Sequence, residues 1–469
     1  MNLQQSNVRL GDPHICSDAQ NRLNILSTIF EALVRRDARG RFQPALATDW
    51  RVSADARAWT FTMRRGVRCQ SGAPISAHEA AASLLRACGP TVGGELGTEG
   101  VYASYLGDAE ISALHEQTLH IVTARPMADL LDLLVDIPIL SQRGLESLPG
   151  ELIGTGPYRF VESNDEEVVL EAFNGYWGGA PKHERLIWQA EPDEATRIDN
   201  LLAGRADLIT DVTPSGGRQI EASASNARYH TQPSNLCVLF MCNAQAGLCA
   251  DRRVRQALNY ALDVPAMIRR AGTGAAQPLN GPLTPLHFGH NAQTASYTYN
   301  PERARDLLAQ AGCSEETQLI LDVPTSLPDE AQLLAQMMAE YYAAVGLQAE
   351  IRLYADRPAY AHMVKAKQIH DACCFDSSPL STYRVLREKL NSEVAGPWWQ
   401  GYHNAEVNRL LAQAAATPDD IGRRTIYQAA YGLIRDDAPW VFLYSPVRGW
   451  GISPNGRQVR IGVTGRLEF

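Results

Sequence analysis

The side-chain combinations that usually carry out catalysis are absent from this sequence. It contains no G-x-S-x-G turn for a serine nucleophile, no G-x-x-x-x-G-K-[ST] phosphate loop and no H-E-x-x-H zinc helix. The Gly154–Pro157 segment, GTGP, has part of a dinucleotide loop, but the third glycine is missing and a proline follows. That combination indicates a turn. We therefore expect a protein that is not an enzyme.

Two groups of histidine and cysteine residues could bind a metal ion. His287 and His290 are three residues apart, and His370 precedes the Cys373-Cys374 pair. Spacing alone is a weak signal, because a zinc site needs several ligands held in one fixed geometry. Roles in a loop or in the core account better for these side chains, so we expect no bound metal and no other cofactor.

The cysteines do not form a recognisable framework. They occupy positions 16, 69, 88, 237, 242, 249, 313, 373 and 374. An odd number at scattered spacing, without any Cys-x-x-Cys, favours buried free thiols. One disulfide, for example among residues 237, 242 and 249, is the alternative.

Composition and charge indicate an ordinary globular protein. The 469 residues suffice for two to four structural units, and 45% of them are hydrophobic against 20% charged. The formal net charge is −9. The arginine pairs are scattered along the chain, at residues 35–36, 64–65, 252–253 and 423–424. A nucleic acid is therefore not an expected partner, since phosphate contacts need clustered cations.

No segment has the length of a membrane span. The most apolar stretch, Leu130–Leu140, is short and carries Asp132 and Asp136. A bilayer-spanning helix needs about 20 apolar residues. The first residues, MNLQQ, lack the basic head and apolar run of a secretory leader.

Helix and strand patterns alternate, which favours an α/β fold with parallel strands in the second half. We expect helices at Leu23–Val34, after a cap at Ser76, at Arg253–Arg270, from Asn300 to Gly312 and at Asp329–Val345, and strands at Trp59–Met63, Thr118–Val122, Leu319–Val323 and Gln348–Leu353. The glycine-rich stretch Gly89–Gly100 is expected to be a long surface loop.

The segment Arg253–Asp263, RVRQALNYALD, resembles the VRQAL-x-x-A-x-D helix of the family 5 extracellular solute-binding proteins. These proteins are the dipeptide, oligopeptide and nickel-type binding components of ABC importers. Further segments resemble the family in its order: Leu10–His14, Ile29–Val34, Pro44–Trp50, Trp59–Phe61, Arg64–Val67, Gly154–Tyr158, Leu202–Asp207, Tyr299–Ala304, Gly401–Val407 and Ala438–Trp440. Each motif alone is weak, but the ordered set covers nearly the whole chain.

The resemblance implies an α/β, two-lobed clamshell of the periplasmic-binding-protein type (type II), with an extra subdomain in the first lobe. Lobe I would combine residues 1–34, 147–233 and 445–469, the subdomain would be residues 35–146, and lobe II residues 236–443. The crossovers near Pro233 and Tyr444 would form a hinge. The chain would then begin where the mature domain of the family begins, which favours a removed leader and a periplasmic location.

The function implied is that of the substrate-binding component of an ABC importer. Such a protein captures a short peptide, an opine or a similar amino-acid conjugate between its lobes and delivers it to a membrane permease, acting as a monomer. Two alternatives stay open. One is a metal-chelate or haem carrier of the same fold, and the other is a leaderless cytoplasmic ligand sensor.

The resemblance also implies a ligand site around Asp376. In peptide-binding relatives the equivalent segment reads W-x-x-D, and its aspartate holds the α-amine of the ligand. Asp376 is therefore the expected amine ligand, with Cys374, Phe375 and Ser377 beside it, because a carboxylate in a dry cleft forms a charge-assisted hydrogen bond to an ammonium. A turn or helix-cap role is the alternative for Asp376. Cys373 replaces the family tryptophan, which puts a standard peptide ligand in question.

The remaining expected contacts are aromatic or cationic. They are Trp399, which with Trp398 would restore an aromatic wall, Tyr102 and Tyr105 in the subdomain, Tyr444 at the return crossover, and Arg143. An arginine suits a planar ligand carboxylate. Packing roles are the alternative for the aromatic residues, and a solvated surface position is the alternative for Arg143.

Overall fold

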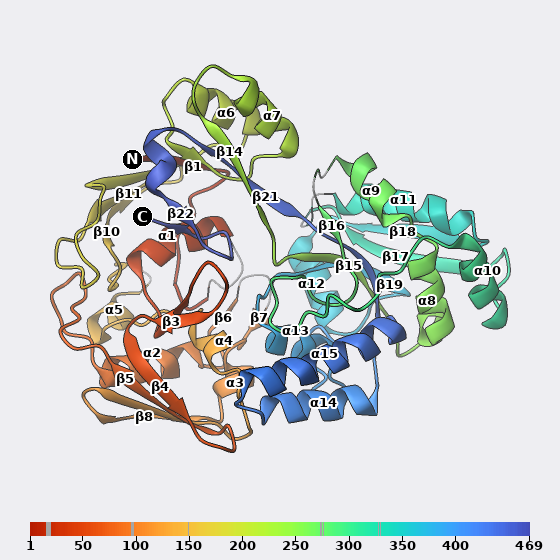
Figure 1. Ribbon diagram of the computed structural model, residues 1–469, viewed down its shortest axis with the longest axis horizontal. Coiled ribbons are helices and arrows are strands. Elements are labelled where there is room, and N and C mark those ends of the chain that lie inside the picture. Colours follow the sequence, from red (N-terminus) through yellow and green to blue (C-terminus); the bar gives the residue numbers. More distant parts are fainter. Residues whose placement is uncertain are drawn as a thin grey trace. The chain divides into compact units, whose positions relative to one another are not determined.

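The computed structural model describes residues 1–15, 20–94, 98–148, 150–272, 274, 276–326, 328 and 330–469 (Figure 1). They form two compact units, which the chain connects twice. Unit 1 comprises Met1–Gln232 and Arg448–Phe469, and unit 2 comprises Pro233–Val447. Three parts of the predictions lie outside the described residues: Cys16, Asp329 and residues 95–97 of the glycine-rich loop.

The main sheet of unit 1 has seven strands in the order β10-β11-β12-β1-β13-β21-β14. Their bounds are β1 Asn2–Gln5, β10 Tyr158–Ser163, β11 Glu167–Ala172, β12 Arg185–Ala190, β13 Leu208–Ile209, β14 Arg228–Pro233 and β21 Val447–Ile452. The first strand, β1, is central and runs parallel to both β12 and β13. Leu3 of β1, Ile25 of helix α1 (Gln20–Ile29) and Trp188 of β12 share one buried core.

A second, antiparallel sheet in unit 1 has the order β4-β5-β9-β8. Its strands are β4 Ala47–Val52, β5 Ala58–Met63, β8 Glu110–His115 and β9 Thr118–Val122. Helix α2 (Ala77–Ala87) packs on β8 and β9. Ser76 caps α2 in a reciprocal box with Glu79, in which the Glu79 carboxylate accepts the Ser76 N–H at 2.8 Å. The predicted strands at 59–63 and 118–122 and the predicted cap are confirmed.

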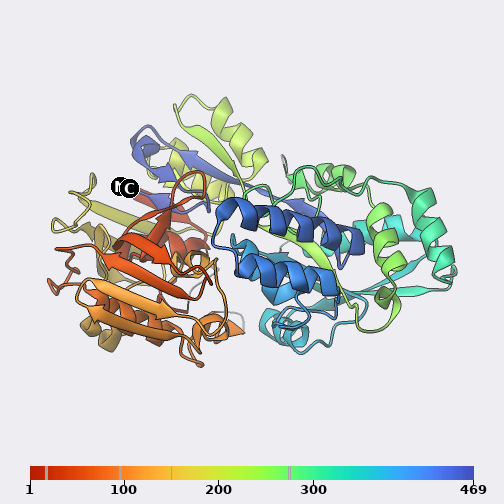
Figure 2. The ribbon, with the colours of Figure 1, turned by 60° about the horizontal axis from the view of Figure 1, so that its bottom comes forward.

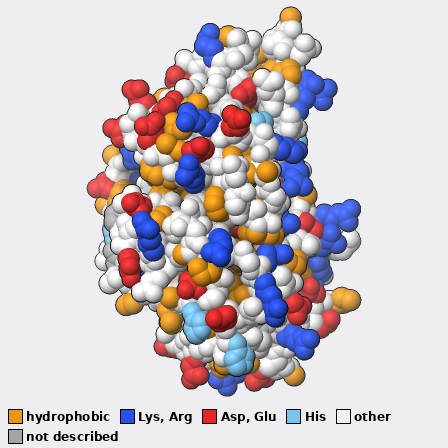
Figure 3. All heavy atoms as spheres, turned by 90° about the vertical axis from the view of Figure 1, so that its left-hand side faces the viewer, with side chains coloured by type: hydrophobic (Ala, Val, Ile, Leu, Met, Phe, Trp, Pro, Cys, Tyr) orange, Lys and Arg blue, Asp and Glu red, His pale blue; other side chains and the backbone are white. Residues whose placement is uncertain are grey.

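The other elements of unit 1 are short. They are β2 Val34–Arg36, β3 Phe42–Pro44, β6 Gly93–Gly94, β7 Thr98–Glu99, α3 Ala103–Leu106, α4 Leu131–Leu134, α5 Gln142–Ser147, α6 Glu194–Leu202, α7 Pro214–Ala222, η2 Asn455–Gln458, β22 Arg460–Ile461 and β23 Leu467–Glu468. On the face shown in Figure 3, acidic and basic side chains are interspersed. That distribution matches the scattering of arginine pairs along the sequence.

The sheet of unit 2 has six strands in the order β16-β20-β15-β19-β17-β18. Their bounds are β15 Cys237–Cys242, β16 Gln277–Pro278, β17 Gln318–Pro324, β18 Gln348–Tyr354, β19 Ala372–Ser377 and β20 Trp440–Ser445. β17 runs parallel to both β18 and β19, whereas β15 is antiparallel to β19 and β20. The predicted parallel strands of the second half are therefore confirmed.

Helices cover both faces of this sheet, as Figures 1 and 2 show. One core includes residues of α8 (Arg252–Tyr260), α9 (Val264–Ala271), α10 (Pro301–Gln310) and α11 (Ala331–Ala343), with η1 (Leu248–Ala250) beside them. The other core includes residues of α12 (Arg357–Lys365), α13 (Thr382–Leu390), α14 (Ala405–Ala415) and α15 (Asp420–Asp437). We call the side of the sheet that carries the first core the α11 face and the side that carries the second core the α13 face. Alternate residues of β15 point to the two faces, Val238 to the α11 face and Leu239 to the α13 face.

Two helix predictions were wrong in extent. The helix predicted at 23–34 ends at Ile29, because its carbonyl accepts the Gly156 N–H at 2.8 Å and the chain then turns into β2. The helix predicted at 253–270 is two helices. Asp263 caps the second of them by accepting the Ala266 N–H at 2.9 Å, and Pro265 has no N–H to continue the first. The predicted surface loop at 89–100 also contains the short strands β6 and β7.

The cysteines in the described part of the chain are all free thiols, so the disulfide considered among residues 237, 242 and 249 does not form. A hydrogen bond to Cys242 and burial raise the pKa of Cys249 well above its usual value. Within the described ranges, no helix combines the length and apolar character that a membrane span requires.

In the sheet of unit 2, β17 and β19 pair over only two residues. Their paired residues are Leu321 with Ala372 and Asp322 with Cys373. Just past these pairs, the buried hydroxyl of Tyr360, on α12, lies 2.7 Å from the Cys374 carbonyl oxygen and 3.0 Å from that of Asp322. The single hydroxyl hydrogen of Tyr360 is thus shared between one backbone carbonyl of β17 and one of β19.

A buried histidine stabilises the start of unit 1. His14 accepts a hydrogen bond at Nδ1 from Arg86, with 2.8 Å between the nitrogens, while its Nε2 lies 2.9 Å from the Pro138 carbonyl oxygen. Arg86 also pairs with Asp12. Burial, opposed by the Pro138 contact, lowers the pKa of His14 to about 4, so the folded protein keeps this imidazole neutral.

We predict that stability falls between about pH 6.5 and pH 4 because unfolding lets His14 bind a proton that the folded protein excludes. The folded pKa is below the unfolded one, so this contribution is fully present above pH 6.5 and is lost as the pH falls. The loss is on the order of 3 kcal/mol at most. Urea unfolding at pH 7.5 and pH 5 should show a smaller pH dependence in His14→Gln than in the wild type. His78→Gln, at an exposed position, is the control; equal pH dependence in all three proteins contradicts the assignment.

We also predict opposite effects for two buried tyrosines of unit 2. Tyr360→Phe removes the hydroxyl that donates to the Asp322 and Cys374 carbonyl oxygens and should lower the free energy of unfolding by about 1–3 kcal/mol. The Tyr342 hydroxyl is buried with no hydrogen-bond partner among the described residues, so Tyr342→Phe should leave stability unchanged or raise it. Urea denaturation of both variants tests the pair. A cost for Tyr342→Phe equal to that of Tyr360→Phe would show that the bridging hydrogen bond is not responsible.

Candidate functional site

The carboxyl ends of β17 and β19 lie where the chain leaves the sheet in opposite directions. β17 leads to α11 on one face, and β19 leads to α13 on the other. In open α/β sheets such a switch point leaves a crevice outside the strand ends, and ligands bind there. The predicted Asp376 is the next-to-last residue of β19, so the topology by itself marks its surroundings as the candidate site.

Asp376 lies in the strand and not in a turn. It pairs with Val238 of β15, and Val238 pairs in turn with Tyr444 of β20. Helix α13, which follows, is capped by Ser381, whose hydroxyl accepts the Arg384 N–H at 3.1 Å. The predicted residues Asp376 and Tyr444 therefore stand in one row across the sheet, two strands apart, with Asp376 half-buried and Tyr444 fully buried.

Two acidic side chains, those of Asp376 and Glu330, lie near Cys374 on the α11 face of β19. The hydroxyl of Tyr444 donates to Oε1 of Glu330 at 2.7 Å, and Glu330 directly precedes α11. Burial, followed by the carboxylates of Asp376 and Glu330, raises the pKa of the Cys374 thiol well above its usual value. Sequence reasoning missed Glu330, although an acidic residue soon after a strand at a switch point was a usable signal.

Two basic side chains, those of Lys389 and Arg357, lie near Phe375 on the α13 face of the same strand. Nζ of Lys389 donates to the Ser377 hydroxyl at 2.7 Å and lies 5.4 Å from the centre of the Phe375 ring. The guanidinium carbon of Arg357 lies 5.9 Å from that ring centre. Trp398 packs against the Phe375 ring, with 4.8 Å between the two ring centres. Neither Lys389 nor Arg357 was predicted, because their helices give no sequence signal that they approach β19.

The structure brings together five of the nine predicted residues in unit 2: Cys374, Phe375, Asp376, Ser377 and Tyr444. Trp399 is half-buried, and its indole N–H donates to the Tyr402 carbonyl oxygen at 2.7 Å. Its neighbour Trp398 is the one that packs on Phe375.

The other three predicted residues belong to unit 1. Tyr102 precedes α3 and donates to the Asp136 carbonyl oxygen at 3.3 Å, and Tyr105 lies on the same short helix; both are buried. Arg143 is exposed on α5 and lies 3.9 Å from a Glu151 carboxylate oxygen. The role of each as a ligand contact stays a prediction.

The histidines considered as metal ligands contact protein groups. His287 lies 2.9 Å from the Pro379 carbonyl oxygen, His290 lies 3.1 Å from Oδ1 of Asn280, and His370 lies 2.9 Å from Oδ1 of Asp322. In the described part of the chain no three histidine, cysteine, aspartate or glutamate side chains converge as a metal site would require.

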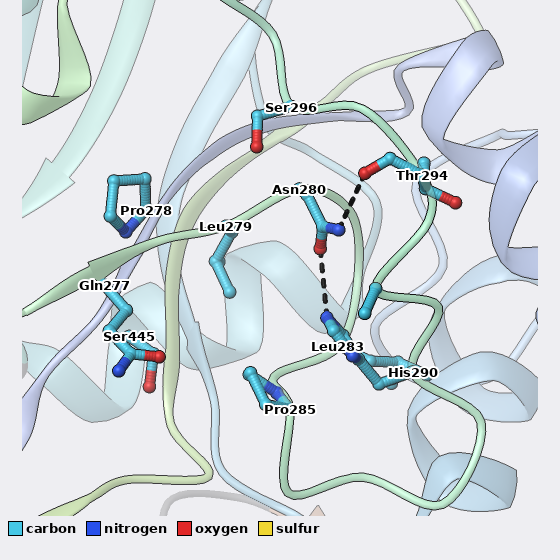
Figure 4. Close-up of a pocket in the computed structure, with 11 residues that line it drawn as sticks. Gln277, Pro278, Leu279, Asn280, Leu283, Pro285, His290, Thr294, Ser296 and Ser445 are labelled. Atoms are coloured by element: carbon cyan, nitrogen blue, oxygen red, sulfur yellow. Dashed lines mark hydrogen bonds between the residues drawn. The ribbon is translucent and has the colours of Figure 1, made fainter.

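A separate pocket of about 250 Å³ lies within unit 2, beside β16 and the end of β20 (Figure 4). Its lining residues are Gln277, Pro278, Leu279, Asn280, Leu283, Pro285, His290, Ala292, Thr294, Ser296 and Ser445. Asn280 joins its two sides, donating to the Thr294 carbonyl oxygen at 2.9 Å and lying 3.1 Å from His290 Nε2. The polar atoms of Asn280 are thus committed to holding the surrounding loop, and none of the predicted site residues lines this pocket.

Comparison with known proteins gives the same fold and places the chain in a family. The model for "bacterial extracellular solute-binding proteins, family 5 Middle" matches residues 41–381. A relative, the glutathione-binding protein GsiB of Shigella boydii serotype 4, is 26% identical over 452 residues, covering 93% of this chain and 86% of that protein.

Solved structures of two-lobed binding proteins superpose on nearly the whole chain. A dipeptide-binding protein of Pseudoalteromonas sp. SM9913 in complex with Met-Leu has a TM-score of 0.81 at 18% identity, covering 100% of this chain and 99% of that one. The binding protein AgaA of A. tumefaciens R10 in complex with agropinic acid has a TM-score of 0.80 at 20% identity, covering 99% and 95%. The chain belongs to the family 5 bacterial extracellular solute-binding proteins, which are the substrate-binding components of ABC importers.

Proposed function

We propose that this protein binds a small ligand carrying a primary amine and that Asp376 holds the amine. The observation behind the proposal is the position of Asp376 at the carboxyl end of β19, at the switch point of the sheet. Glu330, anchored by the Tyr444 hydroxyl, adds a second carboxylate on the same face. Two carboxylates near one apolar strand end favour a cation, and an ammonium can donate to both.

The ligand class we propose is a short peptide or an amino-acid conjugate such as glutathione or an opine. The names of the relatives support it, since they record glutathione, the dipeptide Met-Leu and agropinic acid as bound molecules. Each is small and carries amino-acid chemistry. The replacement of the family tryptophan by Cys373, fully buried on the α13 face, favours a ligand different from that of the standard peptide binders.

We also propose the cellular setting that this function requires. The protein acts in the periplasm as a monomer, passes its ligand unchanged to an ABC permease and does not bind nucleic acid. Apart from a few residues at the two crossovers, unit 1 would correspond to lobe I, from residues 1–34, 147–233 and 445–469, together with the extra subdomain of residues 35–146. The separate antiparallel sheet of strands β4, β5, β8 and β9 supports that subdomain, and unit 2 would correspond to lobe II.

A ligand screen tests the proposed class. A molecule that binds only the folded protein adds RT ln(1 + [L]/Kd), about 2.7 kcal/mol at 100 Kd, to the free energy of unfolding. We therefore expect at least one of glutathione, short peptides and opines to raise the melting temperature measured by thermal shift. Mass spectrometry should then recover the bound compound unaltered. If none of these compounds raises the melting temperature, the proposed ligand class is wrong.

The amine role of Asp376 is tested by Asp376→Asn, which keeps the shape and removes the charge. Loss of the counter-charge from a desolvated ammonium costs about 3–5 kcal/mol, so affinity should fall by roughly two to three and a half orders of magnitude. An N-acylated ligand should bind the variant and the wild type about equally.

Asp420→Asn is the matched control, because Asp420 is an exposed aspartate of unit 2 that pairs with Arg423 at 2.6 Å. It should leave the affinity unchanged. Isothermal calorimetry measures all three proteins. If Asp376→Asn changes affinity for the free amine by less than about threefold, roughly 0.7 kcal/mol, then Asp376 has only a structural role.

A further inference from the structure

We infer that Lys367 is a positioning residue for the end of β19. From the turn before that strand its ammonium holds the Gly396–Trp398 segment, and Trp398 in turn holds Phe375, the neighbour of Asp376. The effect on ligand binding rests on the proposed function, whereas the positions of the Trp398 and Phe375 rings can be measured without a ligand.

The backbone of Lys367 has a conformation that favours glycine. Helix α12 ends at Lys365, and Lys367 follows with a φ of 63°. The Lys367 N–H donates to the Val364 carbonyl oxygen at 3.1 Å, and the Gln368 N–H donates to the Met363 carbonyl oxygen, also at 3.1 Å. This pair of bonds is a Schellman motif, in which the left-handed position is usually a glycine. A lysine there strains the backbone, which indicates that its side chain makes a contact that offsets the strain.

The Lys367 side chain contacts a distant part of the chain. Its Nζ donates to the carbonyl oxygens of Gly396 and Pro397, each at 2.6 Å. Burial, together with the charge of Lys365, lowers the pKa of Lys367 to about 8, so the amine is mainly protonated at pH 7 and both hydrogen bonds are charge-assisted. Because the two acceptors are consecutive residues, one ammonium fixes the orientation of this turn relative to α12.

The Gly396–Gln400 segment is held between α12 and α13. On the α12 side, Nε2 of Gln400 donates to the Val364 carbonyl oxygen at 2.8 Å. On the α13 side, a Cβ atom at residue 396 would lie 2.5 Å from the Glu388 carbonyl oxygen, so this close approach requires a glycine. Lys367 therefore holds one end of the segment against α12, and Gln400 holds the other.

Trp398 transmits this fixed position to β19. It is buried between the two held ends of the segment, and its ring centre lies 4.8 Å from that of Phe375. Phe375 is buried in the core on the α13 face. Since close-packed side chains leave little room for independent movement, a shift of Trp398 moves Phe375 as well. Asp376 is the next residue of the strand, so its carboxylate depends on the same contacts.

Two variants separate positioning from stability. Lys367→Met keeps the backbone strain and removes both side-chain hydrogen bonds. Lys367→Gly removes the same bonds and relieves the strain, so it should be more stable than Lys367→Met in thermal unfolding. Both should lose the positioning effect to the same extent. Lys365→Met is the matched control, because Lys365 is an exposed lysine at the same end of α12.

Fluorine NMR reports on the two rings in the absence of a ligand. One sample carries 5-fluorotryptophan and another 4-fluorophenylalanine, and Trp398→Phe and Phe375→Leu assign the two resonances among those of the 8 tryptophans and 10 phenylalanines. Both resonances should shift or broaden in the two Lys367 variants and stay in place in Lys365→Met. Unchanged resonances in the Lys367 variants overturn the inference. A change confined to the less stable variant also overturns it.

Calorimetry with glutathione and with Met-Leu measures the effect on binding. Whichever probe binds the wild type should bind both Lys367 variants about threefold or more weakly, whereas Lys365→Met should bind it unchanged. Shifted resonances with unchanged affinity overturn the link between Phe375 and the ligand site. If neither probe binds the wild type, the proposed ligand class is wrong, and the two resonances alone decide whether Lys367 positions the end of β19.

Discussion

The hydroxyl of Tyr360 is the contact on which the candidate site depends. At the switch point β17 and β19 must diverge, because the helices that follow them lie on opposite faces of the sheet. Tyr360 places its hydroxyl within hydrogen-bond distance of one backbone carbonyl in each strand. One side chain thus joins β17 and β19 where their short pairing ends.

The segments that identify the family hold the fold and do not line the candidate site. Within the segment Arg253–Asp263, Arg255 donates to the Cys249, Ala250 and Asp437 carbonyl oxygens, and Asn259 bonds both to the Trp440 carbonyl and to the Phe442 N–H. The Asn259 bonds hold β20, the strand that carries Tyr444. Gly154 also has a structural role, because a Cβ atom there would lie 2.0 Å from the Ile29 carbonyl oxygen.

The candidate site itself departs from the rule that charges stay at the surface. Arg384, Glu388 and Lys389 are all buried on α13, a helix of nine residues. Burial of charge is costly unless partners compensate it, and Arg384 and Glu388 compensate each other as an ion pair at 3.7 Å. Asp376 and Glu330 lie near Cys374 on one face of β19, and Lys389 reaches Ser377 on the other face.

Local patterns in the sequence were sufficient for most elements and for the fold class. The Ser76 cap, the strands at 59–63 and 118–122 and the parallel strands of unit 2 form as expected, because hydrophobic periodicity and capping act within a few residues. The end of α1 was not predictable in this way, because the N–H that donates to the Ile29 carbonyl oxygen belongs to Gly156, far along the chain.

For the site, the sequence by itself determined the family, Asp376 and its strand neighbours. The approach of Glu330, Arg357 and Lys389 to β19 was decided only by the tertiary structure. These three residues start or end helices on two different faces of the sheet, and no periodicity in the chain relates them to β19. Their proximity arises from the order of the strands and the side of the sheet on which each helix packs, and those are long-range properties that a local pattern does not contain.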